Sequence, residues 1–592
     1  MTSTSDSHQN AATPARDAGT VAEAFQRTAE RRSDAIALRT RERTLSWREY
    51  AAAVRSMAAR LSGLGIGRGS TVAFMAANRP EFNITDAAAM HLGAICFSIY
   101  NTSAPEQVAA VLADAGNPVL VTEPALAERA RAGAAESRVL LFEELAALPE
   151  DLDLDYDAAW RAIRPDDLVC LIYTSGTTGP PKGVELSHAN VMAGLRGEQA
   201  VIGWRPGDQV VSALPHAHVG DRVMLHYEAM LEGLEVILCP DPRQMLEYVR
   251  DFRPTVFGGV PRHYEKLKAA LEASFLEGGE PESRARARRA LGAGIDRVRA
   301  EQRGEPVSED VLVACREAED AVFRPMREAI GLDRVRNNNQ SGAAPAAIEV
   351  LEFFAAIGVG IIELWGMSEV SCAAIVNPPG AARFGTVGKV LPGAELRVAD
   401  DGELEIRGPS VMRGYRNLPE ATREAFTEDA WLRTGDIARI DADGHVTIVD
   451  RKKELIINAA GKNMSPANIE RCLKEASALV GQAYAHGDRR PYNVALIVLD
   501  PEVARVWTGD VDEEIGAAVE RANRRLSRVE QIKRWARLDE EWLPGGDELT
   551  PTAKLKRRPI AEKYAAVLES LYREPVQDGP PSGTASLRAA TA

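Results

Sequence analysis

Apolar runs of strand length alternate with amphipathic helical stretches along most of the chain. The runs STVAFMAAN, EVILCP, TVFGGVP and GVGIIELWG have the length and composition of buried strands. The helical stretches, such as LSWREYAAAVRSMAARLSGLG, place apolar residues on one face of a helix. This alternation is typical of α/β folds with largely parallel sheets, and we expect such a fold here.

The length of 592 residues exceeds what one hydrophobic core supports, since cores stop growing at about 250–300 residues. The pattern changes near residue 450, where a glycine-punctuated, β-rich stretch gives way to about 120 residues of mixed helix and strand. We expect a large domain over residues 20–450, with a charged helical insertion at 264–333, and a small C-terminal domain over 451–574. Residues 1–19 and 575–592 lack apolar periodicity, and we expect them to be disordered.

Composition excludes several classes of protein. The 71 basic and 86 acidic residues give a net charge of −15, which disfavours binding to nucleic acid or to an anionic membrane. The insertion is rich in arginine, but interleaved acidic residues favour a solvated helix over an RNA-binding surface. The six cysteines are scattered without a CxxC pair, so we expect neither disulfides nor zinc. No apolar segment is long enough to cross a membrane, and we expect a cytoplasmic protein.

The segment LIYTSGTTGPPKG at residues 171–183 joins the end of an apolar strand to a loop of glycines and hydroxyl residues. Glycine lets the backbone approach an oxyanion closely, and successive amides form an anion-binding nest. A lysine follows, so the loop has the groups needed to hold a triphosphate. A Walker A loop is excluded, because a proline replaces its second glycine and a glycine replaces its Ser/Thr. From these residues alone, an ordinary surface loop remains the competing interpretation.

The run TSGTTGPPKGV resembles the signature of the AMP-forming adenylating superfamily, which includes acyl-CoA synthetases, luciferases and nonribosomal-peptide adenylation domains. Further segments match in order: SGAAP and ELWGMSE resemble the adenine-site segments, and GELEIRG with WLRTGD resembles the ribose segment. DRKK with AGKN resembles the hinge and pantetheine-side loop, and LTPTAKLKR resembles the segment that carries the last lysine. The resemblance spans roughly residues 20–572 and implies a large N-terminal domain of β-sheets flanked by helices plus a small, mobile α+β C-terminal domain.

The resemblance also implies a set of site residues. Glu369 would be the Mg²⁺ ligand, and Lys554, Glu369 and Lys182 would carry the chemistry. Lys453 would be the hinge at which the small domain swings. ATP and AMP would be bound by Thr174, Ser175, Gly176, Thr177, Thr178, Gly179, Gly342, Ala343, Ala344, Trp365, Gly366, Ser368, Asp436 and Arg451.

Each of these roles has a competing structural explanation. Trp365 could stack on adenine or fill the core at the end of an apolar strand. Asp436 could accept both ribose hydroxyls or be an ordinary turn residue. In an extended segment Lys554 and Lys556 point to the same side, so spacing does not choose between them; the order Thr-Pro-x-x-Lys of the resemblance selects Lys554.

The implied reaction has two steps. An acid oxygen attacks the α-phosphorus of Mg-ATP and expels pyrophosphate, and a nucleophile then displaces AMP. The branch that the chain resembles most is that of the long-chain fatty acyl-CoA ligases, whose nucleophile is the thiol of coenzyme A. A carrier-protein phosphopantetheine acting in trans is an alternative acceptor. A non-catalytic nucleotide sensor is disfavoured, because no catalytic group is missing.

One segment departs from that branch. Where the family has an apolar strand lining the acyl pocket, this chain has RNNNQ at residues 336–340. Amides are poor strand formers and need many partners when buried. We therefore consider a small polar acid such as nitrite, activated to diazotise an aryl amine, with a surface turn as the competing explanation. The acid pocket would be lined by His216, His218, Asn338, Asn339 and Gln340, with His218 at the family's acid-proximal position.

Overall fold

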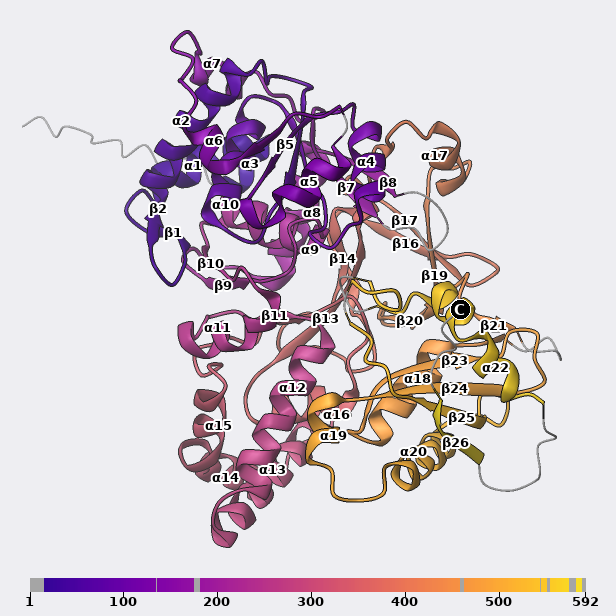
Figure 1. Cartoon of the computed structure of the whole chain (residues 1–592). Coiled ribbons are helices and arrows are strands. Elements are labelled where there is room, and N and C mark those ends of the chain that lie inside the picture. Colours follow the sequence, from indigo (N-terminus) through magenta and orange to yellow (C-terminus); the bar gives the residue numbers. More distant parts are fainter. Residues whose placement is uncertain are drawn as a thin grey trace, which may run out of the picture. The chain divides into compact units, whose positions relative to one another are not determined.

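A computed structural model describes residues 15–134, 136–174, 181–457, 463–543, 545–550, 554–573 and 582–587 (Figure 1). Residues 175–179, which carry most of the phosphate-loop prediction, lie outside this description. The chain forms two compact units. Unit 1 comprises Met1–Gly176, Pro180–Glu395 and Arg407–Ala430; unit 2 comprises Thr177–Gly179, Leu396–Ile406 and Trp431–Ala592.

The largest sheet of unit 1 is built mainly from the apolar runs of the N-terminal half. Its strand order is β18 (Gly414–Tyr415), β8 (Lys182–Ser187), β7 (Leu168–Thr174), β4 (Ile95–Ser98), β3 (Thr71–Met75), β5 (Val119–Thr122) and β6 (Val139–Leu141). The strands from β7 to β6 pair in parallel, whereas β8 is antiparallel to both β7 and β18. Parallel pairing of strands joined by helices confirms the expected α/β class.

A second sheet, of four strands, brings distant segments together in the order β2 (Thr44–Ser46), β1 (Ile36–Arg39), β10 (Glu235–Leu238) and β9 (Gln209–Ser212). The helix α2 (Trp47–Gly63) begins at Ser46, whose side chain and that of Glu49 form a reciprocal capping box. The expected disorder up to residue 19 is wrong for its last five residues. Ala15–Asp17 forms a 3₁₀ turn and Ala18 is fully buried, because Arg196 donates to the carbonyls of Arg16 and Ala18.

The third sheet of unit 1 carries the amide-rich run. Its order is β11 (Gly258–Gly259), β12 (Asn339–Ser341), β13 (Ile361–Met367), β14 (Cys372–Val376) and β15 (Lys389–Val390). Both neighbours of β12 pair with it in parallel. The competing explanation of a surface turn is therefore wrong for Asn338, Asn339 and Gln340, which are all buried; Asn337 alone is exposed. The strand forms because backbone groups satisfy the amide of Asn339.

The charged insertion is helical, as expected, and packs into a core that it shares with strands β9 and β10. Its helices are α12 (Pro261–Leu271), α13 (Pro281–Gln302), α14 (Glu309–Ala318) and α15 (Arg324–Ala329), which Figure 1 shows as one group. Helix α13 packs closely on α16 (Ile348–Ala356), since a Cβ at Gly294 would lie 2.9 Å from Ala356. Arg299 forms a bidentate ion pair with Glu352 on α16 at 2.9 and 2.8 Å. Part of the arginine run thus serves helix packing.

Unit 2 contains two four-stranded sheets and a two-stranded ribbon within its described residues. The first sheet has the order β16 (Glu395–Val398), β17 (Glu403–Arg407), β19 (Leu432–Ile440) and β20 (Val446–Arg451), and the ribbon pairs β21 (Ile456–Ile457) with β22 (Asn463–Met464). The second has the order β23 (Val480–His486), β24 (Asn493–Leu499), β25 (Ile532–Leu538) and β26 (Ser582–Leu587). The C-terminal tail is thus not disordered throughout, because β26 pairs in parallel with β25.

Helices of unit 2 pack against these sheets. They include α18 (Pro466–Ala476), α20 (Val511–Arg525), α21 (Arg557–Lys563) and α22 (Ala565–Ser570). All six cysteines of the chain are free and buried, which agrees with the absence of a disulfide pattern. Among the described helices, none combines the length and the apolar character needed to cross a bilayer.

Candidate active site

Two of the segments expected at the adenine meet at the carboxyl edge of the third sheet. The loop that holds Gly342, Ala343 and Ala344 follows β12, and Trp365 lies near the end of the parallel neighbour β13. A buried carboxyl joins β13 to that loop: Glu363 Oε1 accepts a hydrogen bond from the Ala346 amide at 3.0 Å. Desolvation raises the pKa of Glu363 to about 7.

The backbone at this edge is closely packed. Ala343 has φ +71°, a left-handed conformation that costs a residue with a Cβ about 1 kcal/mol or more. At Gly366 a Cβ would lie 1.5 Å from the Cys372 carbonyl oxygen, so only glycine fits. Trp365 is 8% exposed and lies opposite Ile375 in the strand register. It is thus largely a core side chain.

Glu369 lies in the short turn that links β13 to β14. Ser368–Val370 form one 3₁₀ turn, and the next two residues, Ser371 and Cys372, have φ +60° and +97°. Two consecutive non-glycine residues with positive φ are rare, and such strain persists only where surrounding contacts hold it. Here the Glu369 carbonyl accepts from the Met412 amide at 2.8 Å, and Ser371 Oγ donates to the Ser410 carbonyl at 2.8 Å.

The carboxylate of Glu369 suits a magnesium ion. Its Oε1 accepts from the Tyr415 hydroxyl at 2.8 Å, whereas Oε2 accepts no hydrogen bond from the described residues. The residue is 7% exposed and therefore largely buried. Magnesium takes oxygen ligands, typically one or two carboxylates together with substrate phosphates and water. The residues present therefore fit this ion.

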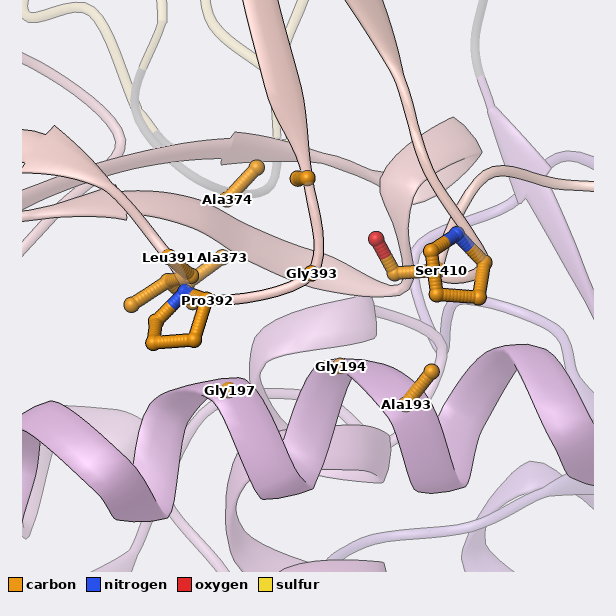
Figure 2. Close-up of a pocket in the computed structure, with 11 residues that line it drawn as sticks. Ala193, Gly194, Gly197, Ala373, Ala374, Leu391, Pro392, Gly393 and Ser410 are labelled. Atoms are coloured by element: carbon orange, nitrogen blue, oxygen red, sulfur yellow. The ribbon is translucent and has the colours of Figure 1, made fainter.

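Small residues of helix α8 (His188–Ile202) support the Glu369 turn from behind. Figure 2 shows Ala193, Gly194 and Gly197 on the helix face turned toward Ala373 and Ser410. A Cβ at Gly194 would lie 3.4 Å from Ser371, and the space left between these elements is only about 10 Å³. Such a volume holds at most one water molecule. This close packing is structural and leaves no room for a substrate.

One turn beyond Gly194 on helix α8, a buried acid contacts strand β14. Glu198 is fully buried, and its Oε1 accepts from the Ala373 amide at 3.2 Å. Desolvation raises the pKa of Glu198 to about 8. Burial, followed by the neighbouring Glu198 and Glu232, also raises the pKa of Glu228. Burial thus favours the protonated form of both carboxyls.

At the phosphate loop the structure describes only the two flanks. Thr174 ends β7 and Lys182 begins β8, and the two residues are register partners. The Lys182 ammonium lies 4.8 Å from the centre of the Tyr415 ring. Ser175, Gly176, Thr177, Thr178 and Gly179 lie outside the described residues. Lys182 and Glu369 thus contact the same tyrosine, and their side chains converge as a triphosphate site requires.

In unit 2, Asp436 and Arg451 come together on adjacent strands. They are register partners on β19 and β20, and Arg451 Nε lies 2.7 Å from Asp436 Oδ1. Asp436 is 4% exposed, whereas Arg451 is exposed. The ion pair fixes the orientation of a buried carboxylate, a group whose oxygens accept hydroxyl donors. The alternative of an ordinary turn residue is wrong, because Asp436 lies inside a strand.

Lys554 lies in a hairpin that places it near this pair. Its amide donates to Thr550 Oγ1 at 3.0 Å, and its carbonyl accepts from the Thr550 amide at 2.8 Å. Although the residue is exposed at its surface, desolvation by surrounding atoms lowers the pKa of its ammonium; Arg451 lowers it further, and Asp436 raises it. Lys556 instead donates to the Gly546 carbonyl at 2.8 Å. The geometry favours Lys554 over Lys556 as the lysine near Asp436.

Lys453 lies in the turn that directly follows β20, and its side chain is exposed. The preceding Lys452 is fixed, because its ammonium bonds to Asp401 at 2.6 Å and Glu403 at 2.7 Å. The turn itself is closed by hydrogen bonds from the Glu454 and Leu455 amides to the Arg451 carbonyl at 3.0 and 3.2 Å, and the hinge role of Lys453 stays a prediction.

The two histidines differ in their surroundings. His216 is buried, stacks on Phe82 at 3.8 Å and lies 2.8 Å from Asp221 through Nδ1. His218 is half-buried, and its Nδ1 accepts from the Gly220 amide at 3.1 Å, which starts a short helical turn. His216 is thus part of a packed polar cluster, and His218 is the more accessible of the two.

Of the amides in the RNNNQ run, that of Asn339 is the one committed to the sheet through several hydrogen bonds. Asn339 accepts from the Phe257 amide at 2.9 Å and donates to the carbonyls of Arg336 and Gly360 at 2.6 and 3.0 Å. Asn338 donates weakly to the Ile202 carbonyl at 3.4 Å. Gln340 Nε2 has no partner among the described residues. Asn339 is therefore removed as a ligand for a polar acid, and the case for an amide-lined pocket weakens.

A family model described as AMP-binding enzyme matches residues 25–416, and one for the AMP-binding enzyme C-terminal domain matches residues 453–575. The chain is an AMP-binding enzyme. The fadD11 protein of Mycobacterium tuberculosis is 46% identical over 433 residues, which cover 71% of this chain and 76% of the relative. The long-chain-fatty-acid–CoA ligase FadD15 of the same species is 35% identical over 563 residues, which cover 89% and 92%.

Solved structures show the same fold for this AMP-binding enzyme. The O-succinylbenzoate Coenzyme A synthetase MenE of Bacillus subtilis, in complex with ATP and magnesium ion, superposes with a TM-score of 0.69 at 22% identity. That match covers 90% of this chain and 98% of the other. A Mycobacterium tuberculosis fatty acyl CoA synthetase gives 0.61 at 21% identity and covers 93% and 99%.

Three polar residues of the AMP-binding enzyme escaped sequence reasoning: Tyr415, Glu363 and Glu198. Tyr415 stands in the segment VMRGYRN, far along the chain from Glu369, and no local pattern joins the two. Glu363 offered a signal, since a lone acid inside the apolar run GVGIIELWG needs a buried partner. Glu198 lies on an amphipathic helix, where its burial depends on packing that the sequence does not show.

Proposed function

We propose that this AMP-binding enzyme is a long-chain fatty-acid–CoA ligase. It would join a fatty acid to AMP with release of pyrophosphate and then transfer the acyl group to coenzyme A. The arrangement of Asp436, Arg451 and Lys554 carries the proposal, because it places a lysine beside a carboxylate suited to a ribose. The named activity of FadD15 supports the choice of acid and acceptor.

In the first step, a carboxylate oxygen of the acid attacks the α-phosphorus, and the bond to pyrophosphate breaks. Two anions must meet, so catalysis consists mainly of positioning and charge neutralisation. Lys554 would lie between the acid and the α-phosphate, and Lys182 would hold the outer phosphates. Surrounding atoms and Arg451 lower the pKa of Lys554, and the exposed residue is open to an incoming anion.

Magnesium, when bound, would neutralise phosphate charge. Glu369 would hold it through Oε2 while Tyr415 holds Oε1. Thr174, the loop 175–179 and Ser368 would donate to the phosphates. Gly342, Ala343, Ala344, Trp365 and Gly366 would form the adenine site at the edge of the third sheet.

In the second step, the thiol of coenzyme A attacks the acyl carbonyl carbon, AMP leaves, and the thiol proton passes to solvent. We propose that the turn at Lys453 changes conformation between the two steps. A substitution of Lys453 by proline would restrict φ there and slow thioester formation more than adenylation. The acceptor could also be a carrier-protein thiol, which direct competition with coenzyme A would reveal.

The test is ATP–pyrophosphate exchange with purified protein and a series of acids: palmitate, shorter fatty acids, an aryl acid and nitrite. We expect exchange with palmitate and formation of palmitoyl-CoA. Lys554→Ala should lower exchange at least about 100-fold, the effect typical of losing one donor to a developing anion. The matched variant Lys556→Ala should keep most of the activity, since that ammonium bonds to a backbone carbonyl.

Exchange with nitrite alone would contradict the fatty-acid assignment and restore the small polar acid. Equal losses in the two lysine variants would show that the hairpin is needed only for its fold.

A further inference from the structure

Tyr415 contacts two side chains to which the proposed function gives separate roles. Its hydroxyl donates to Glu369 Oε1 at 2.8 Å. The face of its ring receives the Lys182 ammonium at 4.8 Å from the ring centre, within the range of a cation–π interaction. One tyrosine thus links the carboxylate proposed for magnesium to the lysine proposed for the phosphates.

The backbone of Tyr415 is held by the sheet. Strand β18 pairs with β8 so that Tyr415 lies opposite Val184, and the next amide, that of Arg416, donates to the Gly183 carbonyl at 2.8 Å. The phosphate-loop lysine begins that same strand β8. Tyr415 and Lys182 are therefore placed by two paired strands, and their contact does not depend on a loose loop.

A helix on the other side restrains the same residue. The Tyr415 amide donates to Thr422 Oγ1 at 2.9 Å, from α17 (Pro419–Ala425). A Cβ at the preceding Gly414 would lie 2.8 Å from the Thr422 side chain, so glycine is required for this approach. The tyrosine is thus fixed before any ligand binds, as a residue that orients another group must be.

The segment that precedes Tyr415 also holds the backbone of Glu369. The Met412 amide donates to the Glu369 carbonyl, and the Ser410 carbonyl accepts from Ser371. Residues 410–415 therefore fix both the strained turn and the carboxylate that it presents. With Oε1 occupied by a hydroxyl, Oε2 is the oxygen left for a cation.

We propose that Tyr415 is a positioning residue that orients Glu369 for magnesium and places Lys182 for the phosphates. The inference rests on the proposed function, since it assumes the metal role of Glu369. Carboxylate ligands of metals are themselves hydrogen-bonded, and loss of such a partner typically weakens metal binding by about 10–100-fold. The ring adds a second effect, because it holds a flexible ammonium near the site until a phosphate replaces the ring as its partner.

The test separates the hydroxyl from the ring. Tyr415→Phe removes only the hydroxyl, whereas Tyr415→Leu removes the aromatic face as well. Mn²⁺ serves as the probe, and its binding to the full chain with a non-hydrolysable ATP analogue is measured by electron paramagnetic resonance. We expect Tyr415→Phe to raise the Mn²⁺ dissociation constant about 10-fold or more and to leave binding of the metal-free analogue unchanged. Tyr415→Leu should also weaken binding of the metal-free analogue.

Tyr156→Phe is the matched control, because it removes a buried hydroxyl that bonds to Gln26 at 2.8 Å in the same unit. It should bind Mn²⁺ as the unmodified protein does. Wild-type Mn²⁺ binding by Tyr415→Phe would overturn the proposal, and so would an equal loss of metal-free binding in that variant, which would mark a structural role. Glu369→Gln reports separately: if it keeps full Mn²⁺ affinity, the metal role in the proposed function fails.

Discussion

Glu198 shows how strongly one buried side chain can depend on its surroundings. Its pKa of about 8 in the fold compares with about 4.5 when exposed. Between these values the folded protein keeps a proton that the unfolded chain has lost, so rising pH favours unfolding. The contribution of Glu198 is fully present below pH 4.5 and is lost as pH rises toward 8.

Glu198→Gln removes this proton and keeps an oxygen that can accept from the Ala373 amide. We expect the variant to gain stability over the unmodified protein as pH rises from 5 to 8, by up to about 1.4 kcal/mol per pH unit. Melting temperatures measured across that range test this, with the exposed Glu106→Gln as control. A difference that does not change with pH would contradict the prediction.

The sequence singled out individual residues where a motif carries the chemistry, and their roles stay predictions. Lys554, Asp436 and Glu369 stand in long motifs, and their surroundings suit the expected roles. Tyr415 was not predictable, because its importance comes from a contact between segments 46 residues apart. The strained pair Ser371 and Cys372 was equally hidden, since neither residue type indicates positive φ.

Strand β12 shows the same limit for a structural element. Amides disfavour strands when only local preference counts, yet tertiary hydrogen bonds to Phe257, Arg336 and Gly360 override that preference. The apolar strands β3, β10 and β13 were predictable from composition alone. Motif order named the two segments expected at the adenine, but neither the sheet edge at which they meet nor the register of β12 against β13 was predicted.

Asn339→Ala should therefore destabilise the sheet without a specific effect on acid binding. It leaves a buried amide and two carbonyls without this partner, and each such group typically costs about 1–3 kcal/mol. We expect a melting temperature lower by several degrees and an unchanged KM for palmitate. The exposed Asn337→Ala should differ by less than about 0.5 kcal/mol. Normal stability with a raised KM in Asn339→Ala would return this amide to the acid pocket.

At the scale of the molecule, buried ionisable groups of opposite type affect stability in opposite directions. Burial lowers the pKa of several histidines, which stay neutral in the fold: His91 to about 4, His188 to about 3 and His263 to about 4. The unfolded chain binds protons at these sites below pH 6.5, so their contribution to stability is present above pH 6.5 and is lost as pH falls toward 4. The buried acids Glu198 and Glu363 have the opposite pH dependence. Their contribution to stability is lost as pH rises from 4.5, toward 8 for Glu198 and toward 7 for Glu363.

Between about pH 4.5 and 6.5, rising pH increases the stability contributed by the buried histidines and decreases that contributed by the buried acids. Just above pH 6.5, of these two sets only the acids still change the stability. We therefore expect the melting temperature to change little from pH 5 to 6.5 and to fall from pH 6.5 to 8. The double variant Glu198→Gln/Glu363→Gln should remove most of that fall, because both groups keep a hydrogen-bond acceptor and lose the proton. It should also become more sensitive to acid between pH 6.5 and 5, where the histidines then act unopposed. Scanning calorimetry at half-unit intervals measures both limbs, and an unchanged profile in the double variant would assign the pH dependence to other groups.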